Sequence, residues 1–171
     1  MKQDYPRNVC VHGNGFVQIN LGGFGERETR IHIFDRRLDD LTQKVNTRRH
    51  NHRFGFVSTV LAGAIVDEGL SFFRAAGTGG WTEWQASGDR MACGNRALVE
   101  RPGDFREVSA GIQQISEGHS YYVLPREFHI SRIATGHSYA VTLMTKTEVL
   151  PIREFSASAM CRHDQKPDIQ F

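Results

Sequence analysis

The residues with the clearest chemical potential are three histidines, two of which are separated by a single residue. His50 and His52 flank Asn51, and His129 lies in a later segment with alternating apolar residues. On an extended strand, the side chains of residues i and i+2 point to the same face, so His50 and His52 can converge on one ion. Imidazole is a preferred ligand of first-row divalent metals. Two imidazoles do not complete a site, and His129 is the candidate for the third ligand.

Acidic residues near these histidines offer alternatives. Asp67 or Glu68 is an alternative fourth ligand, although the hairpin turn expected before them would carry them away from the site. Glu127 lies two residues before His129 and shares its face by strand parity, so it is the candidate general base.

Four other histidines have no partner at ligand spacing and are expected in turns or on the surface: His12, His32, His119 and His137. His32 has an alternative role as an outer neighbour of the metal ligands. The glycines around Asn14 predict a turn, because they do not open a helix in a βαβ unit as phosphate-binding glycines do.

The segments that must position these side chains alternate with the period of strands. Strands are expected over residues 16–21, 29–35, 54–61, 64–68, 70–75, 81–87, 121–124, 128–133 and 139–146. The glycines at 62–63 and 77–80 predict two hairpins, and 101–104 and 117–119 predict turns. One short helix is expected over residues 37–45. Short strands at near-regular spacing favour an all-β sandwich or barrel.

Length and composition fit one globular domain, expected over residues 1–150, followed by a weakly patterned C-terminal tail over 151–171. Apolar residues make up 39% and charged residues 23% of the 171 residues, and the net charge is +2. No block of basic residues predicts a nucleic-acid partner, and no apolar stretch has the length of a membrane span. Three cysteines without a CxxC pair, and no signal-peptide pattern, favour a cytoplasmic location.

In the spacing of its histidines and glycines, the chain resembles the cupin superfamily. His50, His52 and Gly63 match the first cupin motif, in which Phe56 occupies the position of the usual glutamate. The second motif is similar around His129, with Gly118 and Pro125 displaced by one residue at each end. The resemblance covers residues 10–150. It implies an all-β double-stranded β-helix barrel that holds one metal ion through His50, His52 and His129.

The missing glutamate is similar to the pattern of the thiol dioxygenase branch, which includes cysteine dioxygenase. The Ser-x-His-x-Tyr relay of that enzyme would fall on Thr142, Met144 and Lys146, so the relay is absent. Its substrate-binding arginine would match Gln18 loosely, and its crosslinking cysteine would fall on Val57. The fold and the metal therefore carry over, whereas the substrate does not.

The resemblance implies Fe(II) as the cofactor, with Ni or Zn as alternatives, and oxidation of a small molecule by O₂, with a thiol as the favoured substrate. Gln18, Arg30 and Arg48 are the candidate substrate-binding residues. An enzyme, a non-haem iron dioxygenase, is favoured. Two alternatives stay open, namely a non-catalytic cupin that binds a metal or small ligand, and a cupin isomerase or epimerase. A small molecule is the expected partner, and a homodimer is left open.

Overall fold

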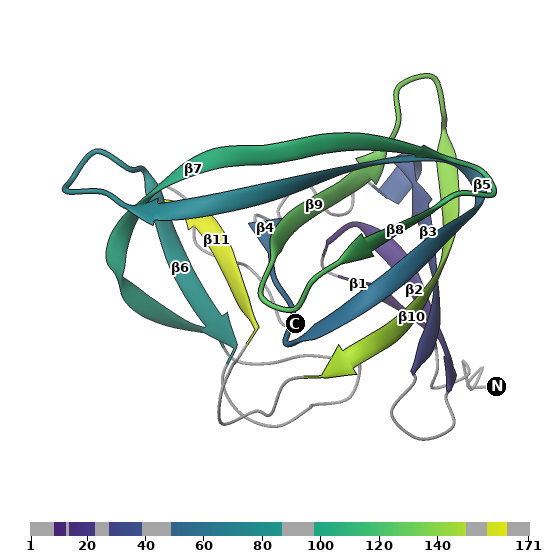
Figure 1. Cartoon of the computed structure of the whole chain (residues 1–171), viewed down its shortest axis with the longest axis horizontal. Helices are drawn as coiled ribbons and strands as arrows, with labels where there is room; N and C mark the ends of the chain where they lie inside the picture. Colours follow the sequence, from purple (N-terminus) through teal and green to yellow (C-terminus); the bar gives the residue numbers. More distant parts are fainter. Residues whose placement is uncertain are drawn as a thin grey trace, which may run out of the picture.

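The computed structural model of the chain describes residues 9–12, 14–22, 28–38, 49–86, 98–149 and 157–163. These residues form eleven strands and one short 3-10 helix (Figure 1). The elements are β1 (Val9–His12), β2 (Phe16–Gly22), β3 (Thr29–Asp35), η1 (Arg36–Leu38), β4 (Arg49–His50), β5 (Phe54–Arg74), β6 (Trp81–Ala86), β7 (Leu98–Ser116), β8 (Ser120–Val123), β9 (Phe128–Ile133), β10 (Tyr139–Val149) and β11 (Ser158–Arg162).

All strand pairs are antiparallel, and they form two connected sheets. Sheet I has the order β1-β2-β3-β10-β5-β8 and uses the first half of β5. Sheet II is a closed ring, in which the second half of β5 pairs with β7 and the pairing continues through β6, β11, β4 and β9 back to β5. Figure 1 shows β5 and β7 side by side across the molecule. The expected all-β barrel is confirmed.

The hairpin expected at residues 62–63 is wrong, because β5 continues through it as one strand of 21 residues. Gly63 has a φ of 74°, and a Cβ atom there would lie 2.4 Å from the carbonyl oxygen of Tyr139. The glycine therefore permits a close approach of β10 and a change of direction without a reversal. This continuity returns Asp67 toward the barrel interior.

Two further expectations about turns are also wrong. Residues 77–80 connect β5 to β6, but these two strands do not form a hairpin, because β7 lies between them and pairs with both. Residues 101–104 lie inside β7, with a local register irregularity opposite β6. Long-range pairing decides both cases. The expected turn at 117–119 is confirmed, since it connects β7 to β8.

The expected helix over residues 37–45 is described only at its start, where η1 covers Arg36–Leu38, and the remainder lies outside the described residues. Within the C-terminal segment 151–171, β11 pairs with β6 and β4 and is almost wholly buried. None of the described helices is long and apolar enough to cross a bilayer.

The core lies against the inner face of sheet I. Its buried residues are Phe16, Phe34, Phe56, Val60, Ile65, Ile115, Tyr121, Val123, Ala140 and Met144. Burying aromatic side chains of this size supplies much of the driving force for closing the barrel. The same inner face meets the three histidines, so one end of the core is also the wall of a pocket.

Candidate metal centre

The three predicted metal ligands meet at one point inside the barrel. His50 on β4 lies directly opposite His129 on β9, and His129 in turn lies opposite Gly69 on β5. His52 follows β4 in the short segment before β5. His50 and His129 are buried, and His52 is half-buried. Their ligand atoms all lie within 4.8 Å of one another.

The spacing of these nitrogens fits a single ion. The Nε2 atoms of His52 and His129 are 3.3 Å apart. An ion about 2.1 Å from each would subtend roughly 100°, between tetrahedral and octahedral angles. Closing the widest pair from 4.8 Å to a similar spacing takes a shift of roughly 1.5 Å, which side-chain rotation supplies. The donor set therefore fits one divalent metal with three imidazole ligands.

Burial keeps His52 in the form that binds metal. Desolvation lowers its pKa well below the usual value, and the neighbouring His50 and His129 lower it further. A neutral imidazole has a free lone pair on one ring nitrogen, which is what coordination requires. Phe54 stacks on His52 with a centroid distance of 4.7 Å, and Phe56 lies 5.6 Å from both His52 and His129. Phe56 thus packs where most cupins are expected to place a glutamate ligand.

Asp67 orients His129, and the expectation that a turn carries it away is wrong. Its Oδ1 atom lies 3.0 Å from Nδ1 of His129 and accepts a hydrogen bond of 2.6 Å from the Ser131 hydroxyl. A carboxylate on Nδ1 fixes the ring so that Nε2 faces the other ligands. Glu68 points outward and pairs with Arg132. Asp67 is therefore an outer partner of the ligand set.

Asn14 is a contact that sequence reasoning missed. The turn expected around it is confirmed, with the Gly15 amide donating to the His12 carbonyl over 3.0 Å. The side-chain amide of Asn14 lies 3.1 Å from both ring nitrogens of His50. The pairing of β1 with β2 brings this turn to the site, and no local pattern reports such a pairing.

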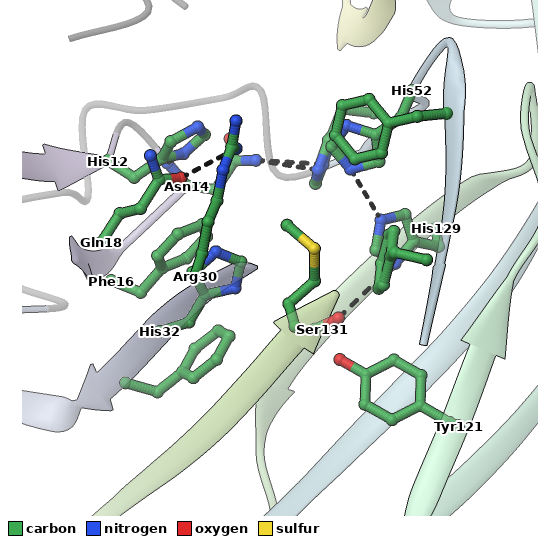
Figure 2. Close-up of a pocket in the computed structure, with 15 residues that line it drawn as sticks. His12, Asn14, Phe16, Gln18, Arg30, His32, His52, Tyr121, His129 and Ser131 are labelled. Carbon is green, nitrogen blue, oxygen red and sulfur yellow. Dashed lines mark hydrogen bonds between the residues drawn. The ribbon is translucent and has the colours of Figure 1, made fainter. Parts of the chain in front are cut away.

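The wall opposite the metal ligands carries the other predicted site residues. Gln18 and Arg30 both line the pocket, and Arg30 donates to the Gln18 side-chain oxygen over 3.2 Å (Figure 2). Arg30 also donates to Glu28, which in addition accepts from Lys146. Arg48 lies outside the described residues.

Two cations share one carboxylate on this wall. Burial alone would raise the pKa of Glu28, but the hydrogen bond from Lys146 and the charge of Arg30 outweigh it and leave a value of about 2. Glu28 is thus ionised, and with Arg30 and Lys146 the cluster carries a net charge of +1. Such a charge favours an anionic group on a bound molecule.

His12 and His32 line the same pocket, so the expectation that both lie in turns or on the surface is wrong. Phe16 lies between them, with centroid distances of 4.6 Å to His12 and 4.4 Å to His32. Desolvation and the charge of Arg30 lower the pKa of His12 to about 4. Desolvation, with smaller contributions from His12, Arg30 and His129, lowers that of His32 to about 3. His119 and His137 are exposed, as predicted.

The pocket between the two walls is small and contains a phenol. Its water-accessible space is about 40 Å³, which admits small groups only. Tyr121 on β8, labelled in Figure 2, and Met144 on β10 both line the pocket. Burial and the charge of Asp67 raise the pKa of Tyr121 to about 12, against a hydrogen bond with Ser131. The pocket therefore has a phenol on β8, although β10 has no tyrosine at the position expected from the cysteine dioxygenase relay.

The candidate base Glu127 is not placed for catalysis. Its carboxylate accepts a hydrogen bond from the Leu124 amide over 3.0 Å, and Glu127 does not line the pocket. The expectation of an inward-facing base at this position is wrong, because the carboxylate caps the turn between β8 and β9.

No protein-family model and no curated protein matches this chain. Similar solved structures include hydroxypropylphosphonic acid epoxidase from S. wedmorenis, with 14% identity and a TM-score of 0.45 over 86% of this chain. The alignment spans only 57% of the epoxidase chain.

A second similar structure is an uncharacterized conserved protein with a double-stranded β-helix domain from Klebsiella pneumoniae subsp. pneumoniae. It has 8% identity and a TM-score of 0.43, with 95% of this chain and 99% of that chain covered. At these scores and identities no function transfers, so the activity of this chain has to follow from its own side chains.

Proposed function

We propose that this protein is a metal-dependent cupin that oxidises a small molecule with O₂, with Fe(II) as the metal and a small thiol as the favoured substrate. The observation that carries the proposal is the convergence of three imidazoles without a carboxylate ligand. A neutral ligand set leaves the charge of the ion available for a thiolate, and three ligands leave coordination positions free. Fe(II) held there supplies the redox chemistry toward O₂.

The side chains divide the remaining work. Asp67 fixes the ring of His129, and the phenyl rings of Phe54 and Phe56 exclude water around the ligands. Arg30 and Gln18, which line the pocket and are hydrogen-bonded to each other, would hold an anionic end of the substrate. Tyr121 keeps its phenolic proton well above neutral pH, so it can donate a hydrogen bond to oxygen. The balanced reaction is RSH + O₂ → RSO₂H, in which both oxygen atoms end on sulfur.

A non-catalytic cupin that binds a metal or small ligand is the second candidate. The side chains on β10 favour it, because Thr142, Met144 and Lys146 offer no Ser-His-Tyr relay. The isomerase or epimerase alternative lacks a base, since the Glu127 carboxylate accepts a hydrogen bond from the Leu124 amide outside the pocket. We further propose a cytoplasmic location, on the composition of the chain.

The test is an oxygen-electrode screen of iron-reconstituted protein with cysteine, cysteamine, 3-mercaptopropionate and larger thiols. We expect one O₂ consumed per thiol for at least one compound, with the sulfinic acid identified by mass spectrometry. His129→Ala should abolish uptake, and Arg37→Gln, an exposed substitution outside the pocket, should not change it. No uptake with any thiol, in protein shown by elemental analysis to hold iron, would support the non-catalytic cupin instead.

A further inference from the structure

The outer face of sheet I is unusually apolar. Its strands point Phe16, Gln18 and His32 inward, so the intervening residues point outward. The outward residues over the middle of sheet I are Val9 and Val11 on β1, Val17, Ile19 and Leu21 on β2, Thr29, Ile31 and Ile33 on β3, Val141, Leu143 and Thr145 on β10, Val57, Thr59 and Leu61 on β5, and Ser120 and Tyr122 on β8. Not one of these side chains is charged, and the charged outward residues Asp35 and Glu148 lie at the ends of β3 and β10.

The strand register joins these side chains into continuous rows. One row runs from Val9 through Ile19, Ile31 and Leu143 to Thr59. A parallel row runs from Val11 through Val17 and Ile33 to Val141. The face is accessible on the edge strand β1, where Val11 is 60% exposed, and on β5, where Leu61 is 45% exposed.

The second sheet shows what an ordinary exterior looks like in the same molecule. Its solvent-accessible side chains mix polar and charged residues, such as the ion pair of Glu68 with Arg132, Gln114 and Arg106, with apolar residues such as Val108 and Ile112. Antiparallel sheets with one face on the core usually present polar residues on the other face. The outer face of sheet I departs from this rule over six strands.

We propose that the outer face of sheet I is the interface of a homodimer, in which two copies pack these faces together about a two-fold axis. Six strands about 4.8 Å apart and five residues long give roughly 500 Å² in plan, before side chains roughen the surface. Side-chain relief brings this toward the ~800 Å² that each partner buries in a stable complex. Contiguous apolar patches of this size mark interaction sites.

A second copy fits this face better than the other candidates do. An uncharged aliphatic surface is complementary to itself, and two such sheets pack about 10 Å apart in β-sandwiches. By sequence, the longer segments outside the described residues suit an aliphatic face less well, since 1–8, 23–27, 39–48, 87–97, 150–156 and 164–171 each contain both acidic and basic residues. A membrane surface would call for basic side chains around the patch to meet anionic headgroups, and the outward residues include none.

The dimer is independent of the proposed oxidation, because it uses the outer face of strands whose inner face forms the pocket. Sedimentation equilibrium of the full chain over a dilution series measures it directly. We expect a mass of twice 19.3 kDa at micromolar concentration. A wild-type chain that stays monomeric at about 100 μM would overturn the proposal, as would a monomer that co-sediments with anionic phospholipid vesicles. Neither result would affect the oxygen-electrode test.

A matched pair of double variants locates the interface. Val57→Lys with Leu61→Lys places two charges on the outer face of sheet I, where both residues are at least 36% exposed, and should weaken dimerisation more than about 100-fold. Val108→Lys with Ile112→Lys places them on apolar residues of β7 that are 42% and 62% exposed, and should leave the dimer intact. Retained metal binding reports that each variant is folded. Loss of the dimer only in the β7 variant would place the interface elsewhere and overturn the proposal.

Discussion

The two walls of the pocket hold histidines in opposite ways. On the wall formed by β4 and β9, the ligand histidines have polar partners, with Asp67 on His129 and Asn14 beside His50. On the second wall, formed by β1, β2 and β3, the Nδ1 atom of His12 accepts a hydrogen bond from the Asn14 backbone amide, but the buried Nε2 atom of His32 has no hydrogen-bond partner. A neutral imidazole with an oriented partner suits a metal, whereas a buried nitrogen without one suits a ligand that supplies the missing bond. Under the proposed function, residues of the first wall would hold the ion and residues of the second would meet the substrate.

The largest effect is expected when one of the three proposed metal ligands is removed. His129→Ala should lower metal affinity more than about 100-fold, beyond the 10- to 100-fold typical for an outer partner. Elemental analysis after dialysis against a chelator measures retention. The control His119→Ala changes an exposed histidine and should retain the ion. Full metal occupancy in the His129→Ala protein would remove His129 from the ligand set.

Lowering the pH should destabilise the folded chain through the histidines of the second wall. His12 and His32 have pKa values of about 4 and 3 in the folded chain. Both values lie below the unfolded value near 6.5, so the unfolded chain binds more protons between pH 6.5 and 4. The pKa of His52 is lowered well below 6.5 as well. The free energy of unfolding of the metal-free chain should therefore be largest above pH 6.5 and fall by up to about 4 kcal/mol per pH unit below it, with His12 and His32 contributing about two thirds of the slope.

Urea unfolding of metal-free protein at pH 6.5, 5.5 and 4.5 measures this slope. Carboxylates add to the slope only at the lowest pH, because Glu28, with a pKa lowered to about 2 in the folded chain, takes up a proton in the unfolded chain near pH 4.5. The variant with His12→Asn and His32→Asn should lose most of the slope, while His119→Asn should keep it. An unchanged slope in the double variant would show that other groups account for the acid sensitivity.

Replacing the outer partner of His129 tests how much orientation contributes on the first wall. Asp67→Asn keeps the shape but loses the charge on His129, and we expect metal affinity to fall about 10- to 100-fold. Glu68→Gln is the matched control, because the adjacent carboxylate points outward to Arg132. Competition with a chelator of known affinity gives both values. Equal affinities in the two variants would mean that the Asp67 contact does not orient the ligand.

The smallest expected effect belongs to the substrate wall. Arg30→Gln should weaken binding of an anionic thiol to the metal-loaded protein about 10-fold, the loss of one charge-assisted hydrogen bond, and leave metal affinity unchanged. Isothermal titration with 3-mercaptopropionate and with cysteamine, which lacks the carboxylate, separates the two effects. A similar loss for both thiols would argue that Arg30 acts through the fold and not through the anion.

Sequence predicts best those parts of the site that depend on local periodicity. Residues 128–133 form β9 with the predicted bounds. His50 and His52 converge as predicted, although only His50 lies on a strand and His52 follows β4 in the short segment before β5. Asp67 was misplaced because a glycine with positive φ can either reverse a strand or bend it, and only the partner strand decides. His12 and Asn14 reach the pocket through the pairing of β1 with β2, whose register no single segment specifies. The barrel was predictable, and the partners of its ligands were not.

The continuity of β5 also bears on how the chain folds during synthesis. β5 leaves the ribosome before β7, β8, β9 and β10, with all of which it pairs. At 5–20 residues per second, the roughly 75 residues up to the end of β10 take about 4 to 15 s to follow. During that time the backbone hydrogen-bonding groups of β5 have no partner strands. Unpaired strands of this kind associate readily with other nascent chains. Slower translation should therefore lower the soluble yield, and a chaperone that holds extended apolar segments should restore it.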